Sequence, residues 1–201
     1  MSELAQSLFS EIGAMTAWES VAVILAIAYL LLAVRENILC WYCALFSTAI
    51  YIHLFWNVSL LMESALNVYY LLMAVFGWYQ WKYGGRQQST LKIQRLSAQN
   101  NLLIILAVLL ATVVSGWLLS QHSDAAWPFV DSFTTWGSVV TTFMVAKKVL
   151  ENWLYWLVID SVSIPLYIDR GLYLTAFLFL VYLFIVVAGY LNWRKIYQQQ
   201  S

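Results

Sequence analysis

The hexapeptide Gly77-Trp78-Tyr79-Gln80-Trp81-Lys82 recurs later in the chain as Gly189-Tyr190-Leu191-Asn192-Trp193-Arg194. The two copies are 112 positions apart (189 − 77), and Tyr70 recurs as Tyr182 at the same spacing. Self-similarity at a fixed offset is the mark of an internal structural repeat. Because each copy closes a long apolar segment, the sequence predicts two related helical units.

Two weaker matches suggest that the repeat extends toward the start of each unit. Glu36-Asn37 with Trp41 resembles Glu151-Asn152 with Trp156 at an offset of 115 (151 − 36). Trp18-x-Ser20-Val21 resembles Trp136-x-Ser138-Val139 at an offset of 118 (136 − 18). Together they predict an offset that drifts along the unit, as loops of unequal length would produce.

The composition is that of an integral membrane protein. Of 201 residues, 63% are hydrophobic and 10% are charged, whereas a soluble domain is about 45–50% apolar. Charged residues divide the chain into seven segments near the roughly 20 residues that a membrane-spanning helix needs. The predicted spans are 17–34, 38–56, 62–81, 101–120, 132–149, 152–168 and 172–193. An alternative with six crossings makes segment 152–168 re-entrant, because that segment is short and contains Asp160 and Pro165.

The predicted fold is all-α, with three helices, one connector and three more helices. A single connecting helix gives both halves the same orientation, which is the parallel-repeat arrangement of one class of transporter. The predicted parts are a periplasmic N-terminal segment 1–16, a first repeat 17–81, a cytoplasmic loop 82–100, a connector 101–120, a second repeat 131–194 and a cytoplasmic tail 195–201.

The distribution of charge predicts the orientation in the membrane. The loop 82–100 holds Lys82, Arg86, Lys92 and Arg95 and no acidic residue, so the positive-inside rule places it in the cytoplasm. Alternation of the helices then puts the N-terminus outside and the C-terminus in the cytoplasm. The formal net charge is zero, which gives no indication of nucleic-acid binding.

The sixth segment holds the densest group of polar and aromatic residues. Asn152, Trp156 and Asp160 are spaced i, i+4 and i+8, so a helix places them on one face. A carboxylate at the membrane centre costs about 2.5–3.5 kcal/mol on translocon scales, which makes a functional role for Asp160 the default hypothesis. The alternative is a hydrogen-bonded Asp that ties helices together.

Tryptophans near this face suggest a cage for a flat organic cation, which a ring face attracts. The candidates are Trp18, Trp41, Trp136, Trp153 and Trp156. Tryptophan also gathers at membrane interfaces, which is the ordinary explanation for Trp41 and Trp153.

The third segment carries a second stripe, made by Glu63, Asn67 and Tyr70 with Ala74 and Gly77. An amide in the membrane gains about 1–2 kcal/mol by pairing in model systems, so Asn67 is expected to face the bundle interior. Glu63 lies near the end of the segment and suits either the site or the outer interface.

Charged residues at the predicted cytoplasmic turns form a separate group. Lys147 and Glu151 are spaced i, i+4 and Lys148 lies between them, so we expect a helix junction or a gate. The same role is assigned to Glu36, Asn37 and Trp41, which the weaker match equates with the second half.

Enzyme chemistry is not indicated. The sequence offers no convincing nucleophile and no glycine-rich phosphate loop, and His53 and His122 are too isolated to hold a metal with the cysteines. Cys40-Trp41-Tyr42-Cys43 has redox-motif spacing but lies at the end of a membrane helix, so inert thiols are expected. No metal or cofactor is predicted. A structural or assembly subunit remains an alternative, with the aromatic residues as packing surface.

At Glu151-Asn152-Trp153-x-x-Trp156-x-x-x-Asp160, Glu63-x-x-x-Asn67-x-Tyr69-Tyr70 and Gly77-Trp78-x-x-Trp81, the chain resembles the nicotinamide riboside transporter (PnuC) family. The resemblance implies a relative of the SWEET-type sugar transporters, located in the bacterial inner membrane. It implies facilitated diffusion of nicotinamide riboside by alternating access, with trapping by a cytoplasmic kinase. It also implies that Asn152 and Trp156 line the ligand, supported by Trp153 and Asp160, with Glu63, Asn67 and Tyr70 opposite.

Asn67 departs from the glutamine expected in many nicotinamide riboside carriers, so thiamine remains an alternative substrate. Both are flat heteroaromatic cations with a hydroxyl group. The absence of a phosphate-binding cluster suggests that nucleosides pass and nucleotides do not. A homo-oligomer in the lipid bilayer is compatible with the sequence.

Overall fold

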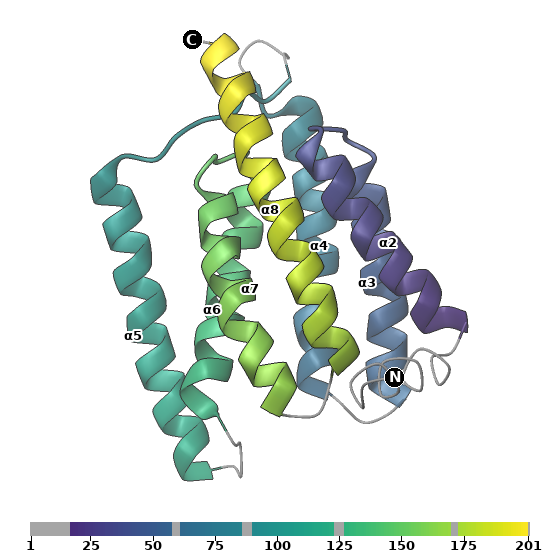
Figure 1. Ribbon diagram of the computed structural model, residues 1–201, viewed down its shortest axis with the longest axis vertical. Helices are drawn as coiled ribbons and strands as arrows, with labels where there is room; N and C mark the ends of the chain where they lie inside the picture. The colour runs from purple at the N-terminus through teal and green to yellow at the C-terminus, as the bar shows by residue number, and fades with distance from the viewer. Residues whose placement is uncertain (1–16, 58–60, 86–89, 123–126, 170–172, 201) are drawn as a thin grey trace, which may run out of the picture.

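The computed structural model describes residues 17–57, 61–85, 90–122, 127–169 and 173–200 (Figure 1). The all-α prediction is confirmed, and the elements are the helices α2 (Ala17–Val34), α3 (Cys40–Asn57), α4 (Leu61–Tyr83), α5 (Ala98–His122), α6 (Pro128–Ala146), α7 (Asn152–Asp169) and α8 (Tyr173–Gln200). The predicted periplasmic segment 1–16 lies outside the described residues.

Several helix ends differ from the predicted spans. Helix α6 ends at Ala146 rather than 149, because Lys148 adopts a left-handed backbone with φ of 50°. Helix α5 begins inside the predicted loop, and α8 continues through the predicted tail to Gln200. Helix α7 continues past Pro165 without a break, which argues against the re-entrant alternative.

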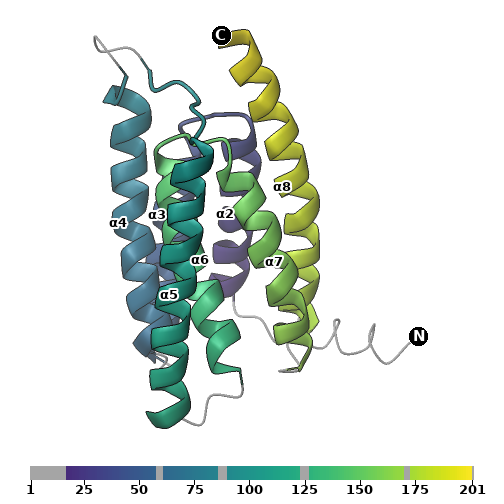
Figure 2. The ribbon, with the colours of Figure 1, turned by 90° about the vertical axis from the view of Figure 1, so that its left-hand side faces the viewer.

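Six helices form a closed ring, with α5 outside it. Helix α3 packs against α2 and α4 in the first half, and α7 packs against α6 and α8 in the second. The halves meet where α4 contacts α6 and where α8 contacts α2, while α5 packs on α6. Figures 1 and 2 show α5 standing at the edge of the bundle. This is the predicted arrangement of three, one and three helices.

The repeat keeps one offset, 112, where matching contacts can be compared. Trp81 Nε1 donates to the Val145 carbonyl at 3.1 Å, and Trp193 Nε1 donates to the Ala33 carbonyl at 2.9 Å. Donors and acceptors are both 112 positions apart (193 − 81 and 145 − 33). These carbonyl groups lie in the last turn of α6 and of α2, where each also accepts a backbone bond from the turn, from Lys148 N and from Glu36 N, both at 3.0 Å.

The predicted drift of the offset is therefore wrong. The turn between α2 and α3 and the turn between α6 and α7 are equally long, with five residues each, 35–39 and 147–151. Glu36 is consequently equivalent to Lys148 rather than to Glu151, and Trp41 is equivalent to Trp153 rather than to Trp156. The shared Glu-Asn dipeptide suggested a register that the backbone does not adopt.

Aromatic rings fill the core of both halves near the turns. Trp41 meets Trp81 edge-on, with centroids 5.4 Å apart, and Trp153 meets Trp193 in the same way at 5.3 Å. Trp81 and Trp193 lie 6.0 Å from each other and so join the two halves. Such edge-to-face pairs add about 0.5–1.5 kcal/mol beyond the burial of area.

Three of the described helices, α2, α5 and α8, are each long and apolar enough to span a membrane by themselves. The other four carry more polar groups, several of which bond to a neighbouring helix. Ser47 of α3 donates to the Ala22 carbonyl at 2.8 Å, and Tyr69 of α4 donates to the Val139 carbonyl at 2.7 Å. Helix packing therefore shields groups that lipid would not solvate.

The α2–α3 turn, the α6–α7 turn, the segment before α5 and the last residues of α8 all lie at one end of the bundle (Figure 1). We refer to it as the C-terminal end. The positive-inside rule predicts that it faces the cytoplasm, and that orientation stays a prediction.

Candidate functional site

One face of α7 carries the predicted polar stripe. Because α7 begins at Asn152 and is continuous, Asn152, Trp156 and Asp160 follow each other at successive turns on one side. Asn152 and Asp160 are buried, with Asp160 only 3% exposed, and Trp156 is partly buried against the aromatic core. A carboxylate is thus held in the middle of a membrane helix.

A tyrosine of another helix lies near this carboxylate. Tyr182 of α8 lies near the Asp160 carboxylate, and Tyr51 of α3 lies near Tyr182. Helices α3, α7 and α8 therefore each bring a polar side chain to the same part of the bundle.

A matching group comes from the other helices. Tyr70 of α4 lies within hydrogen-bonding reach of Ser138 on α6, and Tyr167 of α7 lies close to it. Tyr29 of α2 is also close to Tyr70. Since Tyr70 and Tyr182 are repeat equivalents, each half contributes one tyrosine to the interior at the same position.

We refer to these residues as the interior polar cluster, which comprises Tyr29, Tyr51, Tyr70, Asp160, Tyr167 and Tyr182. Sequence reasoning found Asp160 and Tyr70 but missed Tyr29, Tyr51 and Tyr167, and it noted Tyr182 only as a repeat match. Because Tyr182 lies 112 positions after Tyr70, the repeat could have identified Tyr182 as a second site residue.

For two residues of α4 that were predicted to bind the ligand, the structure gives less detail. Asn67 is partly buried and has an interaction partner. Glu63 belongs to the first turn of α4, and its side chain lies outside the described residues. Their contribution to ligand binding stays a prediction.

Asn152 and Trp153 lie two turns from Asp160, toward the C-terminal end. The Asn152 amide donates to the Val149 carbonyl at 2.6 Å, and Trp153 is 1% exposed and packs on Trp193. The Asn152 Oδ1 and the Trp153 indole nitrogen are buried and have no hydrogen-bond partner among the described residues. Both side chains hold the start of α7 in place, and a role in ligand contact stays a prediction.

The five tryptophans do not form one cage. Trp18 is 66% exposed and Trp136 is 40% exposed, and the Trp136 indole donates to Ser115 of α5 at 3.1 Å. Trp41 and Trp153 are buried in one aromatic core, in which Trp81 and Trp193 connect them. The prediction of a shared cage is therefore wrong, and Trp156 is the tryptophan that shares the stripe of Asp160.

The charged residues at the turns pair differently from the prediction. Lys148 Nζ lies 2.8 Å from Glu36 Oε1 and 4.6 Å from the centroid of the Trp81 ring. Lys147 donates to the Gln80 amide oxygen at 3.0 Å rather than to Glu151. The prediction of a Lys147–Glu151 pair is wrong, because α6 ends before Lys147 and the spacing is not helical.

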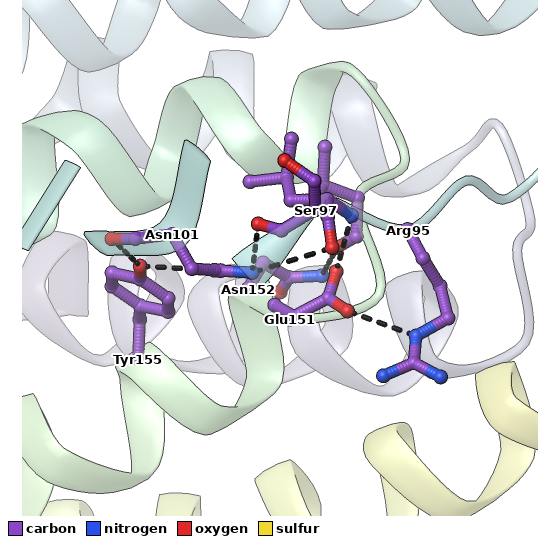
Figure 3. Close-up of polar contacts among 8 residues, drawn as sticks. Arg95, Ser97, Asn101, Glu151, Asn152 and Tyr155 are labelled. Atoms are coloured by element: carbon purple, nitrogen blue, oxygen red, sulfur yellow. Dashed lines mark hydrogen bonds and ion pairs between the residues drawn. The ribbon is translucent and has the colours of Figure 1, made fainter. Parts of the chain in front are cut away.

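Glu151 instead holds the segment that precedes α5, as Figure 3 shows. Its two oxygens accept bonds from Arg95 Nε at 3.0 Å and from the Leu96 backbone at 3.1 Å. The hydrogen bond and the charge of Glu151 raise the pKa of Arg95 above its ordinary value. Further along, the Tyr155 hydroxyl contacts the side-chain oxygen of Asn101 at 3.1 Å. The segment is thus bound to the second half.

Two grooves lie elsewhere, on the outer face of the first half. Their linings are almost entirely apolar, and neither lining includes Asp160 or another residue of the interior polar cluster. One is lined by Trp18, Phe46, Ala49, Ile50, His53 and Leu54, and the other by Trp41, Tyr42, Leu45, Ala74, Val75 and Trp78. Their chemistry suits lipid chains better than a polar substrate.

Comparison with known proteins gives the family. The family model described as "Nicotinamide mononucleotide transporter" matches residues 16–195. The riboflavin/roseoflavin transporter RibM of Streptomyces davaonensis is 27% identical over 126 residues, which is 61% of this chain and 59% of that relative's length. The nicotinamide riboside transporter PnuC of Escherichia coli is 24% identical over 200 residues, covering 87% of this chain and 84% of the relative.

The PnuC of Neisseria mucosa is 26% identical over 196 residues, covering 90% of this chain and 73% of its own. Among solved structures, the crystal structure of the vitamin B3 transporter PnuC superposes with a TM-score of 0.73 at 23% identity, over 98% of this chain and 89% of that one. The structural match shows a shared fold, and the matches together confirm a multi-pass protein of the bacterial inner membrane. The chain belongs to the nicotinamide mononucleotide transporter family and is a membrane transporter, not an enzyme.

Proposed function

We propose that the protein carries nicotinamide riboside across the inner membrane by facilitated diffusion. Relatives from two genera, matched over 87% and 90% of this chain, are named nicotinamide riboside transporters. The observation that carries the proposal is Asp160, a carboxylate 3% exposed in the middle of α7 and close to Tyr182. A buried acid with no Lys or Arg beside it among the described residues favours a positively charged cargo.

The chemistry of the interior fits this substrate. Nicotinamide riboside combines a flat pyridinium cation with a ribose. Asp160 offers the opposite charge, and the ring of Trp156, one turn away, offers a face that attracts cations. Hydroxyl groups of Tyr70 and Tyr182 act as both donors and acceptors, which suits the ribose hydroxyl groups. Nothing in this arrangement calls for covalent chemistry.

Transport by alternating access follows from the two-half architecture. The two repeats enclose the interior polar cluster, so a rocking motion of one half against the other exposes it to each side in turn. Phosphorylation by a cytoplasmic kinase then traps the cargo, which makes uptake net inward without a coupled ion.

The riboside is favoured over its mononucleotide, although the family is named for the latter. Described Lys and Arg side chains lie in turns or near helix ends rather than beside Asp160, namely Arg35, Lys82, Lys92, Arg95, Lys147, Lys148, Arg194 and Lys195. A phosphate at the cluster would meet a carboxylate of like charge, and none of these described cations lies there to offset the repulsion. Nucleotides are therefore excluded by charge.

Riboflavin is a second candidate, because RibM is 27% identical over 61% of this chain. Its isoalloxazine is uncharged, so it would gain little from Asp160. Thiamine, which the substitution at Asn67 leaves open, is a cation and would need Asp160 as nicotinamide riboside does. Charge at position 160 thus separates the cationic cargoes from the flavin.

The test is uptake into liposomes that contain the purified protein. Asp160→Asn keeps the shape of the side chain and removes its charge, so uptake of radiolabelled nicotinamide riboside should fall by about tenfold or more, which corresponds to ~1.4 kcal/mol of lost stabilisation. Asp169→Asn is the matched control, because Asp169 ends the same helix and bonds outside the cluster, to Trp127 at 2.7 Å. Uptake of riboflavin but not of nicotinamide riboside by the unaltered protein would refute the proposed substrate.

A further inference from the structure

Two equivalent residues of the repeat touch each other at the C-terminal end. Glu36 and Lys148 are 112 positions apart (148 − 36), the offset of the repeat, and Lys148 Nζ lies 2.8 Å from Glu36 Oε1. In a twofold arrangement a residue can contact its own equivalent only next to the axis. The ion pair therefore marks the point where the pseudo-twofold axis leaves the bundle.

The backbone at both positions is strained. Glu36 has φ of 53° and Lys148 has φ of 50°, the left-handed region that favours glycine. Each closes the end of its helix in a Schellman turn, completed by bonds from Asn37 N to the Leu32 carbonyl and from Val149 N to the Met144 carbonyl. Residues other than glycine stay in this backbone region where the surrounding structure holds them, and they are often found at functional sites. The two charged side chains are therefore candidates for a function.

The pair is also shielded from water. The side chain of Lys148 is 8% exposed and that of Glu36 is 15% exposed. The ammonium group lies over the ring of Trp81, which belongs to α4 of the opposite half. Attraction between charges is stronger in such surroundings, and separating them leaves each one poorly solvated. Both contacts of the ammonium group cross from one half to the other.

We propose that the Glu36–Lys148 pair is a gate that closes the substrate pathway at the C-terminal end of the bundle. The inference rests on the proposed transport function, because a pathway between two rocking halves runs along the axis that relates them. A contact on that axis blocks the pathway when the charges meet and opens it when they part. The gate is closed in this structure.

The structure also indicates which side of the gate moves. The Gln94 backbone nitrogen donates to the Lys148 carbonyl at 3.0 Å, and the Gln94 carbonyl accepts from the Leu150 nitrogen at 2.9 Å. These two bonds bridge the segment before α5 and the α6–α7 turn. The Gln94 side chain adds a bond to the Lys147 carbonyl at 2.7 Å. Within the described residues the α2–α3 turn carries no such bridge, so Glu36 is the partner expected to move.

A native cysteine reports on this motion. Cys40 begins α3 one turn after Glu36, is 0% exposed, and lies close enough to Lys148 to sense its charge. Movement of the α2–α3 turn away from the axis would expose the thiol to water. Cys43, the other free thiol, is partly exposed and is replaced by serine for the measurement.

The experiment measures the rate at which a water-soluble maleimide labels Cys40 in the full-length Cys43→Ser protein, purified in detergent. Glu36→Gln and Lys148→Gln should each raise the rate by about tenfold or more, a factor equivalent to ~1.4 kcal/mol of closed-state preference. The exchanged variant Glu36→Lys with Lys148→Glu should restore a rate within about twofold of the starting protein, since the attraction is retained. Arg35→Gln, which removes an exposed charge from the same turn, should leave the rate unchanged.

Labelling that stays slow in both single variants would overturn the proposal. So would an exchanged variant that labels as fast as the single variants, because the contact would then depend on position rather than on attraction. If the single variants do not fold, the exchanged variant is the test: fast labelling of Cys40 in that variant, when it is folded, refutes the gate. The measurement needs no substrate, so absence of nicotinamide riboside uptake alongside the expected labelling would reject the substrate and leave the gate standing.

Discussion

Adding a single methyl group at Gly189 should destabilise the protein measurably. A Cβ at this position would lie 2.6 Å from Cε3 and Cζ3 of Trp153, well inside ordinary contact distance. The ring has no room to retreat, because Trp153 is 1% exposed and stands edge-on to Trp193 at 5.3 Å. Overpacking of this kind costs about 1–3 kcal/mol.

The repeat supplies an internal check on this reasoning. Gly77 is equivalent to Gly189, and a Cβ there would collide with the ring of Trp41, the equivalent of Trp153. Gly77→Ala should therefore cost a similar amount. The assay is thermal unfolding in detergent, where a chain of this size shifts by roughly 2–4 °C per kcal/mol.

Shrinking the ring should relieve the collision. Trp153→Phe leaves space beside position 189, so Gly189→Ala should cost less in that background than in the wild type. A double-mutant cycle should give a favourable coupling of about 1–2 kcal/mol, within the range for residues in contact. A Gly189→Ala variant that melts within about 1 °C of the wild type, or a cycle without coupling, would show that the indole does not pack as described.

Three further predictions concern the C-terminal end of the bundle. Trp81→Phe and Trp193→Phe each remove one indole bond to a helix-terminal carbonyl, at 3.1 Å and 2.9 Å, and should each lower the free energy of unfolding by about 0.5–1.5 kcal/mol, measured by chemical denaturation. Glu36→Gly relieves the backbone strain at φ 53°, so it should be more stable than Glu36→Ala by about 1 kcal/mol in thermal melts while labelling Cys40 as fast. Glu151→Gln weakens the bonds to the segment before α5, and amide hydrogen exchange at Leu96 should accelerate without a change at the α2–α3 turn.

Much of the fold was predictable because membrane-spanning helices can be recognised in a sequence by their length and their apolar composition. The Gly-x-x-x-Trp pattern at Gly77 and Gly189 also revealed the repeat, since both glycines admit an indole and both tryptophans bond a helix end. The register at the turns was not predictable from likeness of residues. Glu36 and Lys148 occupy equivalent positions of the repeat but carry opposite charges. A comparison of residue types therefore does not pair them.

The candidate site was predictable only in part. Asp160 stood out because a carboxylate is rare in the middle of a membrane helix. Tyr29, Tyr51 and Tyr167 did not, because tyrosine is common at membrane interfaces and its direction depends on the rotation of each helix. Arg95 could not be predicted as the partner of Glu151 either, because it lies in a segment without helical periodicity.

The central claim is that the protein carries nicotinamide riboside through the pathway between its two halves without a coupled ion. The most direct test is uptake of radiolabelled nicotinamide riboside into liposomes with the same buffer on both sides. We expect the riboside to equilibrate until the two concentrations are equal, faster than in protein-free liposomes. Unlabelled riboside should slow the signal and the mononucleotide should not. Uptake no faster than in protein-free liposomes by folded protein, or equal competition by the mononucleotide, would contradict it.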